Sequence, residues 1–159
     1  MFSETTEQNF RIPKTVAQVT CHTFSGEKFE GEIYLDGPAN RTPSQILDFF
    51  NSDTLFLPVK TSADEPPRLI SKNSLVLVNI GPFTPDVRKE TSSFLTQRKK
   101  ALFLVQCIGS IHAEVLIDTP DYQARVLDVL NLAERFLPIL VEENYCLLNS
   151  CRIFEVMEL

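Results

Sequence analysis

The stretch EIYLDGP at residues 32–38 decides the fold, because it returns 82 residues later as EVLIDTP at residues 114–120. Two further stretches return at a spacing of 80 residues: ILDFFN at 46–51 becomes VLDVLN at 126–131, and FLPV at 56–59 becomes FLPI at 136–139. The matches keep their order along the chain. A repeat of this kind indicates a structural unit that is present twice. The sequence therefore predicts an internal duplication, with units at about 15–80 and 101–159.

Local signals within each unit predict the element order β-β-α-β-β-β. In the first unit, the turn signal Ser25-Gly26-Glu27-Lys28 separates two strands, and Thr42 and Pro43 mark the start of a helix that Asn51 ends. The expected strands of the first unit are 16–24, 29–35, 54–59, 69–70 and 75–80. Those of the second are 102–108, 111–117, 135–141, 145–148 and 152–157, with a helix over 121–131.

Short antiparallel sheets of this kind tend to curl, and a helix then covers the open side. The predicted fold class is α+β, mostly β: two tandem β-β-α-β-β-β modules, each a small barrel-like sheet with one helix, related by pseudo-twofold symmetry. The expected domains are a flexible N-terminal tail (1–14), module 1 (15–80), a basic crossover linker (81–100) and module 2 (101–159). The strand at 101–105 is apolar on both faces, so it is predicted to be buried at the junction between the modules.

Composition excludes several classes of protein. The chain has 159 residues and a net charge of −6, and an acidic surface repels the phosphate backbone of nucleic acids. The longest apolar runs, 75–78 and 101–105, are too short to cross a bilayer, so no membrane association is expected. The N-terminus lacks the pattern of a secretory signal. Four cysteines without a CxxC motif are typical of reduced thiols, which predicts a cytoplasmic protein.

No complete catalytic or metal-binding motif is present, so neither an enzyme activity nor a cofactor is expected. Residues 26–33 have the glycine spacing of a phosphate-binding loop but lack its Lys and Ser/Thr. His112 and Glu114 match a fragment of a zinc-deaminase motif. A metal site formed by His112, Glu114 and Cys107 is the weakest of three functional hypotheses. Cys107 aligns with Cys21 in the repeat, and both are expected to be small buried residues.

Two groups of residues are candidates for a role. The linker is the basic part of the chain, and its cations are candidate partner-binding residues: Arg88, Lys89, Arg98, Lys99 and Lys100. Residues that recur in both units at helices, strands and turns are expected to be structural, because turns and helix ends use Asp and Asn routinely. These are Asp48, Asn51, Pro58, Asp128, Asn131 and Pro138.

The strand-turn-strand segment, the Leu-Asp-x-x-Asn helix, the Phe-Leu-Pro strand and the final hairpin resemble an uncharacterised bacterial family of small strand-rich modules with an Sm-like or SH3-like barrel, here in tandem. The resemblance implies neither a known activity nor site residues. The predicted function is a non-enzymatic interaction or adaptor protein that presents an edge strand or a groove to a protein partner. The alternative is an Sm-like RNA-binding protein that uses the basic linker. Homo-oligomerisation is left open.

Overall fold

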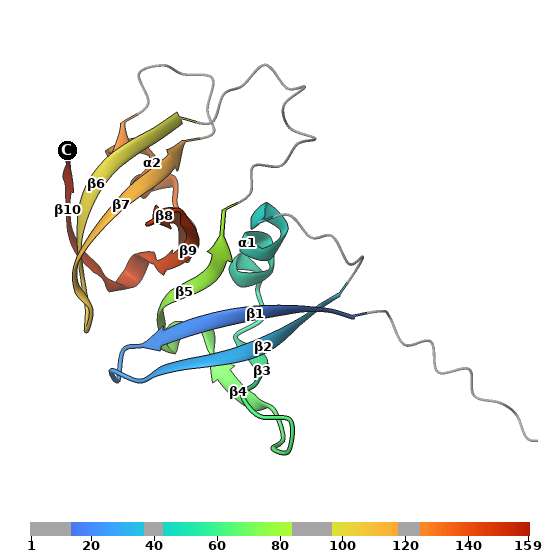
Figure 1. Cartoon of the computed structure of the whole chain (residues 1–159). Helices are drawn as coiled ribbons and strands as arrows, with labels where there is room; N and C mark the ends of the chain where they lie inside the picture. Colours follow the sequence, from blue (N-terminus) through green and yellow to red (C-terminus); the bar gives the residue numbers. More distant parts are fainter. Residues whose placement is uncertain (1–13, 37–42, 84–96, 118–124) are drawn as a thin grey trace, which may run out of the picture.

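The structure of the protein is a computed structural model that describes residues 14–36, 43–83, 97–117 and 125–159 (Figure 1). Its first part contains β1 (Lys14–Thr23), β2 (Lys28–Asp36), α1 (Pro43–Asn51), β3 (Phe56–Lys60), β4 (Arg68–Ser71), the 3-10 helix η1 (Lys72–Ser74) and β5 (Leu75–Pro82). Its second part contains β6 (Gln97–Val105), β7 (Gly109–Ile117), α2 (Val126–Leu132), β8 (Phe136–Val141), β9 (Asn144–Asn149), the 3-10 helix η3 (Ser150–Arg152) and β10 (Ile153–Glu158).

All ten of these strands belong to one antiparallel sheet, in the order β10-β6-β7-β8-β9-β5-β1-β2-β3-β4. The prediction of two tandem barrel-like modules is therefore wrong. The finding that overturns it is the pairing of β5 with β9, which joins Leu77 to Leu148 and Val78 to Leu147. Neither part closes on itself, because a strand of the other part occupies the edge that closure would need. The fold is mostly β, with two α-helices in the described ranges.

The strand order also excludes the predicted pseudo-twofold axis. Such an axis would pair a strand with its own counterpart across the centre of the sheet. Instead β5, which follows η1, meets β9, which precedes η3. The sheet order β10-β6-β7-β8-β9 and the sheet order β5-β1-β2-β3-β4 follow one another head to tail.

The interior of the sheet is packed by two clusters of buried apolar side chains. The first contains Phe50 of α1 together with Phe136 and Leu147 from the second part of the chain. The second contains Val76 of β5 together with Phe103 of β6. Each cluster thus takes side chains from both parts, so removing either part would expose apolar surface of the other.

The predicted position of residues 101–105 is also wrong, because β6 lies next to the outer strand β10 and away from the centre. Ala101, Phe103 and Val105 face the core, whereas Leu104 is 40% exposed. The strands with consecutive buried residues on both faces are β5, at Leu75–Val78, and its partner β9, at Tyr145–Asn149.

A buried lysine anchors the segment between α1 and β4. Lys72 of η1 is fully buried, and its Nζ donates hydrogen bonds to the carbonyl oxygens of Phe49 (3.0 Å) and Ser52 (3.3 Å) and to the hydroxyl of Thr54 (2.9 Å). A cation at the C-terminal end of a helix is favourable because unpaired carbonyls give that end a partial negative charge. Lys72 therefore fixes the end of α1 against the turn that leaves β4.

The remaining sequence predictions fall partly outside these ranges. Residues 1–13 of the expected tail, Thr42 and residues 84–96 of the expected linker lie outside the described residues. Residues 97–100, which the sequence assigned to the linker, form the first part of β6.

Candidate interaction surface

The two outer strands of the sheet, β4 and β10, each have one side without a partner strand in the described part of the chain. In Figure 1, β10 lies at the left of the molecule and β4 lies at the bottom. β4 is paired through Leu57–Ile70 and Pro58–Leu69 to β3, and β10 is paired to β6. An unpaired strand edge presents backbone N–H and C=O groups that can pair with another strand.

Exposed apolar side chains accompany both edges. Beside β4, Leu69 is 70% exposed and Phe56, at the start of the neighbouring β3, is 59% exposed. On β10, Phe154 is 71% exposed and Met157 is 52% exposed. We call the first pair the β4 edge and the second pair the β10 edge. Large apolar side chains beside unpaired backbone groups are typical of a surface that another chain covers.

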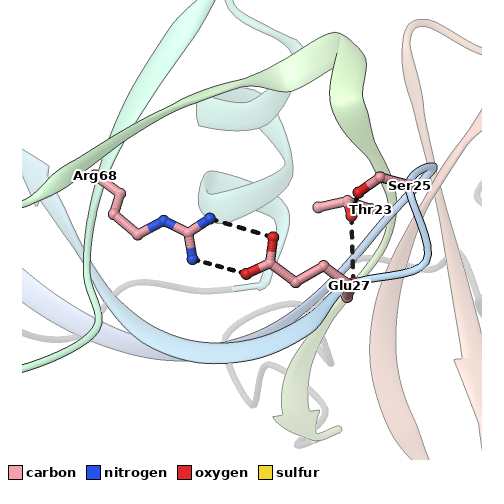
Figure 2. Close-up of polar contacts among 4 residues, drawn as sticks. All are labelled: Thr23, Ser25, Glu27 and Arg68. Carbon is pink, nitrogen blue, oxygen red and sulfur yellow. Dashed lines mark hydrogen bonds and ion pairs between the residues drawn. The ribbon is translucent and has the colours of Figure 1, made fainter.

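A bidentate ion pair holds the β4 edge in place (Figure 2). Arg68 of β4 donates to both carboxylate oxygens of Glu27, at 3.0 and 3.3 Å, and its guanidinium lies 4.7 Å from the centre of the Phe29 ring. Glu27 belongs to the β1–β2 turn, in which Thr23 shares a hydrogen bond with Ser25 at 2.8 Å and donates to the Glu27 carbonyl at 3.3 Å. The glutamate raises the pKa of Arg68 through its hydrogen bond. The hairpin tip thus anchors a strand that has only one neighbour in the sheet.

The pairing of β5 with β9 shows what a covered edge looks like in this fold. Leu147 of β9 is fully buried, and Phe136 of β8 is 1% exposed. The ring of Phe136 contacts that of Phe50 edge to face, with 5.5 Å between the ring centres. Asn51, at the end of α1, accepts a hydrogen bond from the Phe136 N–H (2.8 Å) and donates one to the Phe136 carbonyl (3.2 Å). Strand pairing, aromatic packing and an amide clamp together form the junction.

The structure does not gather the candidate cations into one surface. Arg88 and Lys89 lie outside the described residues. Arg98 lies 3.5 Å from a Glu114 oxygen and 3.4 Å from a Glu143 oxygen, and Lys99 lies 3.7 Å from a Glu158 oxygen. Side chains alternate between the two faces of a strand, so Lys99 lies on the opposite face of β6 from Arg98 and Lys100. Carboxylates neutralise part of this charge, which does not favour phosphate binding here.

The residues of the metal hypothesis are not brought together. His112 and Glu114 line a hollow of about 340 Å³, whose other charged lining residues are Lys100, Glu142 and Glu143. Cys107 lies instead in the β6–β7 turn, where its thiol donates to the Phe24 carbonyl at 2.8 Å. Within the described ranges, no group of three or more His, Cys, Asp or Glu side chains is placed to hold a metal ion.

The cysteines differ in exposure. The expectation that Cys107 is buried is wrong, because this residue is exposed and has a positive φ of 65° in the turn. Cys21, by contrast, is fully buried, and burial raises the pKa of its thiol to about 12. Burial likewise raises the pKa of Cys146 to about 12. Since the thiolate is the reactive form of cysteine, neither buried residue is suited to nucleophilic chemistry.

The recurring residues lie at defined positions of the fold. Asp128 accepts a hydrogen bond from the Arg125 N–H (3.0 Å) at the start of α2, and this bond lowers the pKa of Asp128. Pro58 stands opposite Leu69 and Pro138 opposite Leu147. Asp48 lies on α1 and Asn131 lies on α2, where Asn131 is exposed.

Sequence reasoning missed the apolar residues of the two edges: Phe56, Leu69, Phe154 and Met157. A local signal exists for β10, because Glu155 and Glu158 interrupt its apolar residues, and charges within a strand are typical of a sheet edge. For β4 the only signal is the shortness of the strand.

The residues that the structure describes define a strand-rich fold whose single sheet has an unpaired strand edge at each end. Comparison with known proteins gave no match: no protein-family model, no curated protein and no solved structure is significantly similar to this chain. No helix in the described ranges is long and apolar enough to span a membrane.

Proposed function

We propose that this protein is a non-enzymatic interaction protein that binds a protein partner by strand addition at the edges of its sheet. The observation that carries the proposal is the coincidence of unpaired backbone and exposed apolar side chains at both outer strands. In this mode of recognition, an added strand gains main-chain hydrogen bonds while pockets for its alternate side chains supply specificity. Four free cysteines support a reducing, cytoplasmic location for the interaction.

A photo-crosslinking experiment tests the proposal. A photoreactive phenylalanine is placed at Leu69 on the β4 edge, at Phe154 on the β10 edge or at Glu30, an exposed position on the interior strand β2. The full chain is produced in cells and irradiated, and mass spectrometry identifies the crosslinked peptides. We expect protein adducts at position 69 or 154 and none at position 30. Equal labelling at all three positions, or none at either edge, would contradict the proposal.

RNA binding is the competing class of function, and a titration separates the two. We expect no binding of single-stranded oligonucleotides at low salt, measured by fluorescence anisotropy. Salt-dependent binding that disappears when Arg98, Lys99 and Lys100 are all changed to Gln would overturn the proposal in favour of RNA.

A further inference from the structure

Each outer strand has a counterpart at the centre of the sheet: β4 corresponds to β9, and β10 corresponds to β5, in the order of elements along the two parts of the chain. β4 and β9 both precede a 3-10 helix, and β5 and β10 both follow one. The correspondence extends to register, because β4 sets Leu69 opposite Pro58 and β9 sets Leu147 opposite Pro138. β5 and β10 also share an irregularity, since each pairing shifts register two residues into the strand.

We propose that the β4 edge of one copy of this chain pairs antiparallel with the β10 edge of a second copy, in the arrangement that β9 and β5 adopt within the chain. This inference rests on the proposed function and names the partner strand. The argument is continuity with an existing interface: the chain already contains this junction once, and each copy exposes both halves of it again.

The internal register predicts which residues meet. Val78 lies opposite Leu147, and their counterparts are Val156 on β10 and Leu69 on β4. Leu69 is 70% exposed, whereas Leu147 is fully buried. Pairing in this register would cover Leu69 with the strand that carries Val156 and would place the carboxylate-bearing β10 beside Arg68. Burial of apolar surface drives such an association.

A second, independent correspondence lies on the helices. Asn51 of α1 holds the backbone of Phe136 through two hydrogen bonds. Asn131 has the matching position on α2 and is exposed, and its side chain makes no hydrogen bond to a residue that the structure describes. Phe56 has the matching position to Phe136 but is 59% exposed, against 1% for Phe136. The proposed pairing brings Asn131 of one copy to the backbone of Phe56 of the next, so the clamp and its target are satisfied together.

Because the two edges differ, the contact is heterologous. Each copy has one β4 edge and one β10 edge, so it can bind two neighbours. Repetition of such a contact gives a ring if the rotation closes and a filament if it does not. A symmetric dimer, in which one edge pairs with itself, is not the arrangement proposed.

Two variants of the full chain, each with one edge blocked, test whether the β4 edge pairs with the β10 edge. Phe56→Asp with Leu69→Asp blocks the β4 edge, and Phe154→Asp with Met157→Asp blocks the β10 edge. Light scattering after size exclusion should show the wild-type chain as an oligomer and each variant as a monomer. An equimolar mixture of the two variants should give a 1:1 dimer, because one intact pair of edges remains. Val16→Asp, at an exposed position of the interior strand β1, is the matched control and should leave the oligomer unchanged.

A monomeric wild-type chain at about 100 μM would overturn the proposal, because specific assemblies of useful strength have dissociation constants well below this. Dimerisation of either blocked variant alone would also overturn it, since that requires an edge to pair with itself. If the wild-type chain is monomeric while crosslinking at position 69 captures a different protein, self-pairing fails and strand addition stands.

A pair of introduced cysteines tests the register of the proposed contact. Leu69→Cys and Val156→Cys, combined in a chain carrying Cys107→Ser and Cys151→Ser, should form disulfides between copies on oxidation by copper phenanthroline and oxygen. Replacing Val156→Cys by Glu158→Cys should abolish them, and equal crosslinking from both would contradict the register.

Asn131→Ala should weaken association about tenfold, measured as the concentration at half dissociation. Unchanged association would remove the clamp from the proposal.

Discussion

The centre of the sheet and its two ends are built from corresponding strands, which are buried at the centre and carry exposed apolar side chains at the ends. At the centre, Leu147 and Val76 are fully buried; at the ends, their counterparts Leu69 and Phe154 are 70% and 71% exposed. The residue types are similarly apolar, so the difference arises from whether a neighbouring strand is present. Leu69 and Phe154 lie on strands that lack a neighbour on one side, whereas Leu147 and Val76 lie on strands with a neighbour on both sides. Experiments that compare the centre with the ends therefore measure what that neighbour contributes.

The largest expected effect comes from truncating an aromatic ring at the centre. Phe136→Ala should lower the free energy of unfolding by about 3–5 kcal/mol, because it leaves a cavity against Phe50. Phe56→Ala, its counterpart at the β4 edge, should change it by about 0.5 kcal/mol or less. Both are measured by urea unfolding in the variant with the β10 edge blocked, so that association does not contribute. Equal losses would show that the ends are packed like the centre.

The amide clamp should give the next largest difference. Asn51→Ala leaves the Phe136 N–H and carbonyl without their side-chain partner inside the junction, which should cost about 1–3 kcal/mol. Asn131→Ala, in the same monomeric background, should leave the free energy of unfolding unchanged within error. A matching loss at Asn131 would mean that its amide already has a partner within the chain.

Alkaline pH should weaken the fold through buried groups at the centre of the sheet. Burial raises the pKa of Cys146 from 9.0 to about 12 and that of Tyr145 from 10.0 to about 12, and both residues lie on β9 at the junction. A group with a raised pKa in the folded state contributes stability that is complete below its unfolded pKa and is lost as pH rises toward the folded value. Stability should therefore fall from about pH 9 upward.

At pH 10 the thiol of Cys146 should account for about 1 kcal/mol of this fall. Urea unfolding of the wild-type chain and of Cys146→Ala at pH 7 and pH 10 measures the contribution, since the variant should show a shallower pH dependence. Cys151, which is exposed, provides the control: Cys151→Ala should keep the wild-type dependence. A Cys146→Ala profile parallel to wild type would contradict the assignment.

The smallest effect is expected at the ion pair beside the β4 edge. Arg68 and Glu27 are 40% and 47% exposed, and solvent screens a pair of this kind. Glu27→Gln should lower the free energy of unfolding by less than about 1 kcal/mol, and less again at 1 M salt. A larger loss that salt does not reduce would point to a packing role for Glu27.

Local elements could be predicted from the sequence, whereas the pairing of distant strands could not. The turn at residues 25–28 and the helix from Pro43 to Asn51 are specified by neighbouring residues, and both are present. The contact between β5 and β9 is not specified in this way, because several unpaired edges could accept either strand. The prediction of two closed modules assumed that each part would pair its own strands.

Local sequence also does not identify which apolar strand lies at the junction. Residues 75–78 and 101–105 are both continuous apolar runs, and periodicity alone does not distinguish them. The side chain of Leu104 is 40% exposed because it lies on the face of β6 opposite the core-facing Phe103 and Val105. The exposed apolar residues of the edges were not predicted for a related reason. Their exposure depends on which strand lies alongside, and the residues of β4 do not determine that.

The pairing of β5 with β9 has a consequence for folding during translation. Asn149 donates a hydrogen bond to the carbonyl of Leu75, 74 residues earlier. During synthesis β5 therefore emerges long before its partner, and contacts of high sequence separation form slowly. Until β9 arrives, four consecutive apolar residues lie on an open strand, a condition that invites aggregation. Slowing translation between β5 and β9 should lower the soluble yield, and a chaperone that holds extended apolar segments should restore it.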